Sequence, residues 1–304
     1  MIKYIAKRLG MSILTVLIIS MITFFVMNMV PGGPFNNEKA SSAAVQKVLE
    51  ERYNLDKPVP EQYVIYMKNL IINHDWGVSL KSGRPIWEDL WSKFKVSAKL
   101  GLSAALVALA SGIVLGSLAA LKRNTWVDRL IVFLTTLATA MPSFVLATLL
   151  MLVFCLKLQL FPVWSVNDPN YTLPIIALCL YPMAYTTRLT KTSMLDSLNQ
   201  DYVRTARAKG MQVWKVIFKH ALKNALIPVV TYAGPMIAYI LTGSMVVENI
   251  FTIGGLGTSF VTSINNRDYP MIMACTLFLA IIMVVANLLT DIAYKWIDPR
   301  ISLD

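Results

Sequence analysis

The residues whose types and spacing could do chemistry in this chain are basic, and they lie in one polar segment between two long apolar stretches. Residues 188–223 hold eight Lys and Arg side chains and two Asp. Such cationic side chains offer ion pairing and hydrogen bonding rather than covalent catalysis. We therefore interpret this segment as the place where another molecule can bind and move this protein. Its basic residues are Arg188, Lys191, Arg204, Arg207, Lys209, Lys215, Lys219 and Lys223.

The sequence contains no set of residues typical of an enzyme or a metal centre. The three cysteines fall inside apolar stretches, and His74 and His220 are expected on opposite sides of a membrane, so they cannot form a metal cluster. Lys81-Ser82 and Lys191-Thr192 lack the glycines that precede these residues in a phosphate-binding P-loop, and there is no nucleophile elbow. We predict no catalytic, cofactor-binding or metal-binding residue in this chain.

Within the basic segment, a short helix followed by a glycine is predicted to form an elbow. We expect Asp201 to be the N-cap of a helix over residues 202–209, and Gly210 to end that helix in the left-handed conformation. A second helix is expected from Val213 toward the membrane, which would suit a rigid lever. The alternative, a basic loop held by anionic lipid, explains the charge but neither the glycine nor the apolar residues that follow Val213.

Composition places these elements in a membrane. The 304 residues are 56% hydrophobic and 15% charged, with a mean hydropathy of +0.58, which is too apolar for an ordinary soluble domain. A bilayer core about 30 Å thick needs roughly 20 apolar residues in a helix. Six uncharged runs of that length predict an all-α polytopic membrane protein with spans at 9–30, 100–121, 130–156, 169–187, 224–247 and 269–290.

The distribution of Lys and Arg predicts the orientation of these spans. Sixteen of them lie in the N-terminal segment 1–8, the loops 122–129 and 188–223, and the tail 291–304, whereas the short loops opposite hold only Lys157 and Arg267. Short cytoplasmic loops are enriched in Lys and Arg, so both termini are predicted to be cytoplasmic. The net charge of +11 then has a topological cause and requires no nucleic-acid partner. The first run, with 22 residues, is too long for a cleaved signal and is expected to be retained.

The first external loop is expected to be ordered. In the first loop, residues 31–99, the stretches 38–53 and 61–72 have charged and apolar residues at helical spacing. Residues 86–99 predict an amphipathic helix on the outer surface, with its tryptophans at the level of the lipid headgroups. That helix either anchors the next span or forms part of a docking surface for an external protein. The second such loop, 248–268, is rich in Gly and Thr.

Prolines, but no ionisable side chains, occur inside the predicted spans. A proline removes a backbone hydrogen bond and can kink a helix, so the candidates for a gate or kink are Pro142, Pro182, Pro228 and Pro235. The absence of intramembrane charge disfavours a proton- or ion-coupled secondary transporter or channel, which is the alternative of another class.

The basic segment resembles the cytoplasmic motif of the membrane subunits of ABC importers. The family pattern Glu-Ala-Ala, three residues, then Gly maps onto Arg204, Thr205, Ala206 and Gly210, with Arg204 replacing Glu. The run V-R-T-A-R-A-K-G at 203–210 and the run H-A-L-K-N-A-L-I-P at 220–228 are similar to the dipeptide, oligopeptide and nickel branch. The run 31–35, P-G-G-P-F, and the long first loop are most similar to the B-type permease of an oligopeptide importer.

This resemblance implies a type I ABC importer permease in the inner or plasma membrane. The implied partners are a homologous second permease subunit, two ATPase subunits that bind ATP and Mg, an external peptide-binding protein and an oligopeptide substrate. The helix 202–209 would dock into an ATPase subunit, with Arg204, Arg207 and Lys209 facing its acidic groups. Ala206 would permit close approach and Gly210 would set the angle. The pathway would run between spans two to five, with the fourth and fifth lining it. Dipeptide, nickel, glutathione or a signalling peptide are the alternative cargoes.

Overall fold

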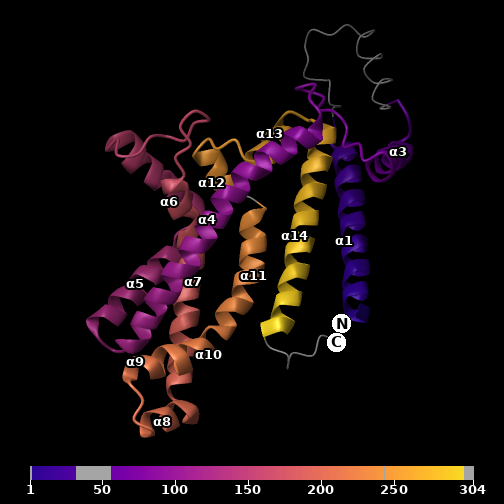
Figure 1. Cartoon of the computed structure of the whole chain (residues 1–304). Helices are drawn as coiled ribbons and strands as arrows, with labels where there is room; N and C mark the ends of the chain where they lie inside the picture. Colours follow the sequence, from indigo (N-terminus) through magenta and orange to yellow (C-terminus); the bar gives the residue numbers. More distant parts are fainter. Residues whose placement is uncertain (1, 32–55, 243, 298–304) are drawn as a thin grey trace. The chain divides into compact units, whose positions relative to one another are not determined.

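The computed structural model describes residues 2–31, 56–242 and 244–297, and the predicted helical stretch at 38–53 lies outside them. The described residues are mostly helical, and their one β-type pairing is an isolated bridge between Val78 and Pro85 (Figure 1). They divide into two compact units. One unit comprises the described residues of 1–96 and 255–285, and the other comprises those of 97–254 and 286–297. This agrees with the predicted all-α class.

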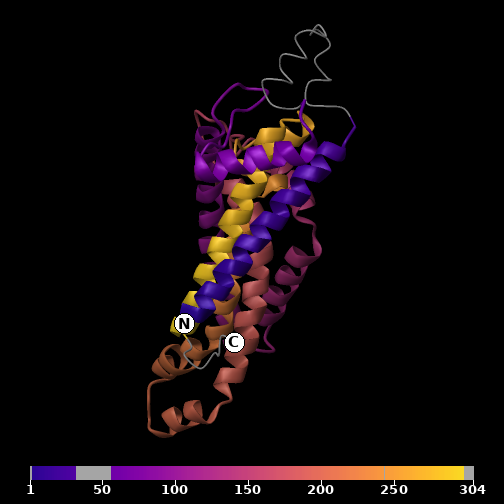
Figure 2. The ribbon, with the colours of Figure 1, turned by 90° about the vertical axis from the view of Figure 1, so that its right-hand side faces the viewer.

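In the first unit, α1 (Ile2–Met29) lies beside the beginning of α14 (Tyr269–Ile297), as Figures 1 and 2 show. Phe24 and Met27 of α1 are buried in one cluster with Met273 and Leu277 of α14. Elsewhere α1 exposes its large apolar side chains, such as Ile13 and Ile22. A helix that is apolar on all sides is typical of a membrane span. The predicted helix at 61–72 is confirmed within α3 (Val59–Ile72).

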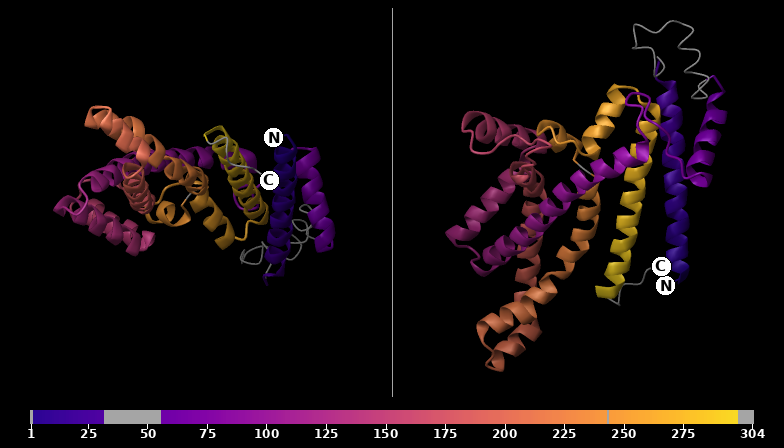
Figure 3. Two further views of the ribbon diagram at one scale, coloured as in Figure 1. Left: turned by 90° about the horizontal axis from the view of Figure 1, so that it is seen from below. Right: turned by 45° about the horizontal axis from the view of Figure 1, so that its top comes forward.

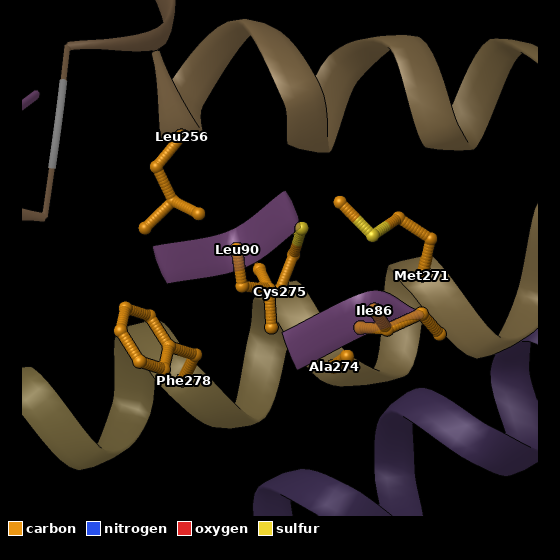
Figure 4. Close-up of a cluster of buried hydrophobic side chains, with 7 residues drawn as sticks. All are labelled: Ile86, Leu90, Leu256, Met271, Ala274, Cys275 and Phe278. Carbon is orange, nitrogen blue, oxygen red and sulfur yellow. The ribbon is translucent and has the colours of Figure 1, made fainter. Parts of the chain in front are cut away.

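The predicted surface helix at 86–99 is wrong as a separate element, because it is the first part of α4 (Ile86–Leu121). Residues 96–100 contain no proline and no left-handed glycine that could end the helix. The helix therefore continues for 36 residues, about 54 Å. Its predicted apolar face is present. Figure 4 shows Ile86 and Leu90 against Cys275 and Phe278 of α14, with Leu256 of α13 (Leu256–Asn265) in the same cluster. The remaining members are Met271 and Ala274.

In the second unit, the predicted third span is not one straight helix. It consists of α5 (Trp126–Ala140), α6 (Ser143–Leu150) and the π-helix η1 (Met151–Lys157), with a bend of 102° at the break. Met141 is extended, with φ −85° and ψ 128°. A residue before proline is driven out of the helical region, so Pro142 accounts for the break. By contrast, Pro182 lies inside the unbroken α7 (Thr172–Leu198).

Glycines allow the helices of the second unit to approach closely. A Cβ on Gly112 or Gly116 of α4 would lie within 2.6 Å of Thr186 or Thr190 of α7. The spacing Gly-x-x-x-Gly is the pattern that lets membrane helices pack backbone to backbone. Gly101 of α4 approaches α11 (Ile227–Leu241) in the same way, since its Cβ would lie 2.8 Å from the Ile240 carbonyl. These contacts hold α4 against α7 and α11.

Among the described residues, three helices are long and apolar enough to cross a membrane: Ala6–Met29, Ile86–Leu121 and Tyr269–Ile292. Two bent pairs raise the number to five if each pair is one span. These are Trp126–Ala140 with Ser143–Lys157, and Val213–Ala225 with Ile227–Leu241. The predicted fourth span coincides with α7, which is outside this count. The number six and the sidedness of the termini therefore stay predictions.

Candidate coupling site and cavity

The predicted helix and glycine stop are present in the basic segment. The helix α8 (Asp201–Ala208) is followed by Gly210, whose φ of 72° lies in the left-handed region. The N–H of Gly210 donates to the Arg207 carbonyl at 2.9 Å, and the N–H of Met211 donates to the Ala206 carbonyl at 3.3 Å. This pair of bonds is the Schellman motif, which closes a helix through a left-handed residue. The turn after α8 is thus fixed by backbone hydrogen bonds.

The start of α8 differs from the prediction by one residue. The N-cap is Gln200, without a side-chain cap bond, and Asp201 is the first helical residue. A carboxylate in the first turn is stabilised by the positive end of the helix dipole, whether or not it caps a backbone N–H. The Asp201 carboxylate also lies 3.5 Å from the Arg204 guanidinium, as an exposed pair. Asp201 as the cap is therefore wrong, although it still belongs to the helix start.

The two faces of α8 have different roles. Val203 and Ala206 are buried among the chain's own apolar side chains, including Met194 of α7. The implied role of Ala206 in close approach to a partner is therefore wrong, because its methyl group packs inward. The outward face carries the other predicted coupling residues Arg204, Thr205, Arg207 and Lys209, all exposed, and Gly210 is exposed as well. The Thr205 hydroxyl donates to the Asp201 carbonyl at 2.9 Å.

The predicted second helix is present but is wound in an unexpected way. We call residues 213–225 the lever segment, which consists of α9 (Val213–Lys215), the π-helix η2 (Val216–Leu222) and α10 (Lys223–Ala225). Figure 3 follows the chain from α8 into this segment and on to α11. Val216 and Ala221, five residues apart, are both buried against Val203 and Ala206. The i to i+5 winding of a π-helix brings residues five apart onto the same face.

The lever segment continues directly into α11. The two are bent by 48° at Leu226, and Pro228 is in the first turn of α11, where proline is tolerated. Pro235 lies inside α11, after Gly234. A Cβ on Gly234 would overlap the Thr290 side chain of α14, within the same unit. The packing of α8, the lever segment and α11 therefore forms one continuous path from the exposed basic face to the interior of the second unit.

A cavity of about 710 Å³ lies at the end of this path. Three of the four predicted kink prolines line it: Pro142, Pro182 and Pro235. Pro228 does not line it. The other lining residues carry no charge. Met141 and Ser244 lie between helices, and the rest come from α5, α6, α7 and α11. They are Ala138, Thr139, Ala140, Met141, Ser143, Leu146, Ala177, Leu178, Tyr181, Tyr232, Met236, Tyr239, Ile240 and Ser244.

Tyrosines that sequence reasoning did not single out lie at this cavity, and Arg188 of the basic segment contacts its wall. The ring of Tyr185 on α7 lies 4.4 Å from the ring of Tyr232 on α11, between centroids. The Arg188 guanidinium donates to the Thr139 hydroxyl at 2.8 Å. Farther along α7, the Lys191 ammonium lies 2.5 Å from one oxygen of the buried Asp128 carboxylate. The other carboxylate oxygen accepts a hydrogen bond from the Asn124 N–H. These polar contacts join α5 to α7, two of the helices that line the cavity.

A buried carboxylate also lies just beyond the predicted fifth span. Glu248 belongs to α12 (Met245–Ile250), is fully buried, and accepts a hydrogen bond from the Ser97 hydroxyl at 2.7 Å. The sequence placed this residue at the start of the predicted external loop 248–268. No group of His, Cys, Asp or Glu side chains suited to a metal ion occurs in the described residues.

Two family descriptions match this chain. The family described as "Binding-protein-dependent transport system inner membrane component" matches residues 112–303. The one described as "Binding-prot-dependent transport system membrane comp, N-term" matches residues 1–100. The first covers the coupling site, the lever segment and every residue that lines the cavity.

Relatives of known name are similar over their full length. The chain is 46% identical to the dipeptide transport system permease protein DppB of Bacillus subtilis, covering 100% of this chain and 99% of that protein. It is 39% identical to the oligopeptide transport system permease protein OppB of Salmonella typhimurium, covering 99% of each. Among solved structures, the inward-facing MetNI methionine ABC transporter is similar with a TM-score of 0.58 at 14% identity, covering 69% of this chain and 97% of that one. That likeness shows the fold.

Proposed function

Because the chain belongs to the family of binding-protein-dependent transport system inner membrane components, we propose that it is a permease subunit of an ATP-driven peptide importer and forms half of the translocation pathway. The chain is a multi-pass membrane protein of the all-α class. The other half of the pathway would come from a homologous second permease subunit, and an external peptide-binding protein would deliver the cargo.

One observation carries the proposal: the exposed basic face of α8 is joined to the wall of an uncharged cavity by packed residues. Val203 and Ala206 fix α8 to the lever segment, which continues into α11. Tyr232, Pro235 and Tyr239 of α11 line the cavity. A displacement of α8 by a partner would thus be transmitted to the cavity wall. Coupling requires such an element with different contacts in two states.

The ATPase subunits are the partners that would move α8. ATP and Mg would bind to them, since this chain has no P-loop. Arg204, Arg207 and Lys209 present three cationic groups that suit an acidic groove, in which charge-assisted hydrogen bonds are strong. Closure of the ATPase pair would carry α8 with it, and the Schellman turn at Gly210 would pass the motion on without loss.

The cavity is suited to a peptide that is recognised through its backbone. Its volume is within the range of about 300–1,000 Å³ that is typical of small-ligand sites. Tyrosine and serine hydroxyls can both donate to and accept from peptide groups, and the uncharged lining selects no particular side-chain charge. An importer that carries peptides of varied sequence needs this kind of surface.

Cargo length is the finer part of the proposal. The P-G-G-P-F run and the long first loop favour oligopeptides, whereas the higher identity to a dipeptide permease favours dipeptides. The test is uptake of labelled peptides of two and five residues into proteoliposomes that contain the complete complex, its binding protein and ATP on the ATPase side. We expect ATP-dependent accumulation of at least one of them. Accumulation driven by a proton gradient without ATP would contradict the proposal.

A further inference from the structure

Three lysines form a continuous exposed row on the lever segment. Lys215, Lys219 and Lys223 are four residues apart and all exposed. In either α or π winding, a step of four residues is close to one full turn, so the three ammonium groups follow one side of the segment. We call this the lysine row. The chain has no Asp or Glu between residues 202 and 247 to neutralise it.

A second exposed row, next to the lysines, is aromatic. Trp214 and Phe218 are also four residues apart, and their exposed fractions are 59% and 61%. Val213 extends the row and is 69% exposed. The Lys215 ammonium lies 5.5 Å from the Trp214 ring centroid, which brings the two rows together. Large aromatic side chains beside cations are typical of the boundary between lipid headgroups and acyl chains.

The third side of the segment is already occupied by the chain itself. Val216, Ala221 and Ala225 are buried in the cluster that holds α8 and the end of α7. The lysine row and the aromatic row therefore face away from the protein's own core. The segment is amphipathic in an unusual sense, with an inward apolar side and an outward side that combines aromatic and cationic groups.

The position of the segment in the chain identifies what covers the outward side. It directly precedes α11, whose apolar run begins at Ile227, and the bend of 48° between the two separates their directions. A cluster of lysines immediately next to a membrane span is attracted by the negative surface potential of the cytoplasmic leaflet. We propose that the lysine row and the aromatic row lie in the headgroup layer and bind anionic lipid, so that the bilayer supports the lever segment while α8 remains available to its partner.

This inference goes beyond the proposed function, because it assigns a lipid site that would exist whatever the cargo. It requires the membrane location that the family shows and the cytoplasmic side that the distribution of Lys and Arg predicts for this segment. The competing occupant is an ATPase subunit that extends from α8 over the aromatic row. Charge cannot distinguish anionic lipid from an ATPase subunit, since both would be acidic. The test must therefore measure contact with lipid directly.

The test uses the complete complex in nanodiscs of phosphatidylcholine, with or without about 30% phosphatidylglycerol. A fluorophore is attached to Phe218→Cys, and lipids with a quencher on the headgroup report proximity. Tyr202→Cys on α8 is the control site, and the chain without an added cysteine gives the background from its three buried native cysteines. We expect at least about twofold more quenching at residue 218 with phosphatidylglycerol, and no change at residue 202.

Charge variants then assign the effect to the lysine row. The triple change Lys215→Gln, Lys219→Gln and Lys223→Gln should remove the increase, whereas the three changes to Arg should keep it. Salt at about 0.5 M should weaken it, because exposed charges are screened over a few ångströms at that concentration. Quenching that is independent of phosphatidylglycerol would overturn the proposal. So would a label at residue 218 that becomes accessible to lipid only after the ATPase subunits are removed.

Discussion

The N–H of Met211 donates to the carbonyl of Ala206 at 3.3 Å, and this bond crosses Gly210. It closes the end of α8 at the turn that leads to the lever segment two residues later, and it exists because Gly210 adopts a φ of 72°. A side chain with a Cβ is disfavoured there by roughly 1–2 kcal/mol, more if it is β-branched.

Gly210→Val should therefore reduce the number of peptides imported per ATP hydrolysed while leaving membrane insertion intact. Nothing lies within 4 Å of a Cβ at this position, so the effect would come from the backbone alone. Gly83→Val is the matched control, since Gly83 also has a positive φ of 68° and open space around it but lies far from α8 in sequence. Unchanged coupling in Gly210→Val, or an equal loss in Gly83→Val, would contradict the role of the turn.

Reversing charge on the outward face of α8 should weaken docking of the ATPase subunits. Arg204→Glu with Arg207→Glu places two carboxylates where we propose an acidic partner, and we expect the copurifying ATPase to fall about tenfold or more. Lys68→Glu, an exposed change on α3, is the control for charge reversal. Equal recovery of ATPase from both variants would remove the assigned role of the arginines.

Filling the cavity should block cargo without disturbing assembly. Ser143 lines the cavity and is exposed to it, so Ser143→Trp should lower peptide uptake about tenfold while ATPase copurification stays normal. Thr136→Trp is exposed on the same helix bundle but does not line the cavity, and it serves as the control. Full uptake by Ser143→Trp would place the pathway elsewhere.

The Gly112 and Gly116 contact predicts a stability effect. Gly116→Ala would place a methyl group 2.5 Å from the Thr187 carbonyl, and overpacking of this kind costs about 1–3 kcal/mol. The unfolding temperature in detergent should fall. Gly10→Ala, with no atom within 4 Å of its Cβ and a gain in helix propensity, should not lower it. A Gly116→Ala protein as stable as Gly10→Ala would show that α4 and α7 are not packed as described.

The predicted orientation can be checked by labelling of introduced cysteines. Ser165→Cys should react with a membrane-impermeant reagent from outside, whereas Asn199→Cys should react only after permeabilisation. Asn199 is exposed at the end of α7, whereas the neighbouring Ser197 is buried and unsuited to labelling. The reverse pattern would invert the topology.

The parts of this site that could be predicted from sequence are those encoded locally. Gly210 follows a short polar helix and precedes apolar residues, so the left-handed stop needed no tertiary information. The inward direction of the Ala206 side chain could not be predicted in this way. It depends on packing against Val216 and Ala221 and on the π-helix that brings these two together, and no local pattern indicates that helix.

Prolines show the same limit. Pro142 breaks a helix and Pro182 does not, although both lie inside predicted spans. Whether the freed backbone groups find new partners depends on neighbouring helices. The convergence of Pro142, Pro182 and Pro235 on one cavity likewise required the packing of α5, α6, α7 and α11. The pattern at 86–99 predicted the apolar face of this helix correctly, but not the burial of Ile86 and Leu90 against α14. Its continuity with the rest of α4 depends on the absence of any stop signal, which is weak evidence in a sequence.

The most direct test of the central claim is the composition of the complex. Deletion of residues 202–210 would also remove Val203 and Ala206 from the core, so the unaltered tagged chain should be used. It is purified from gently solubilised membranes and its partners are identified by mass spectrometry. The proposed function predicts two ATPase subunits and one homologous permease in stoichiometric amounts. Recovery of this chain alone, with retained transport in proteoliposomes, would contradict it.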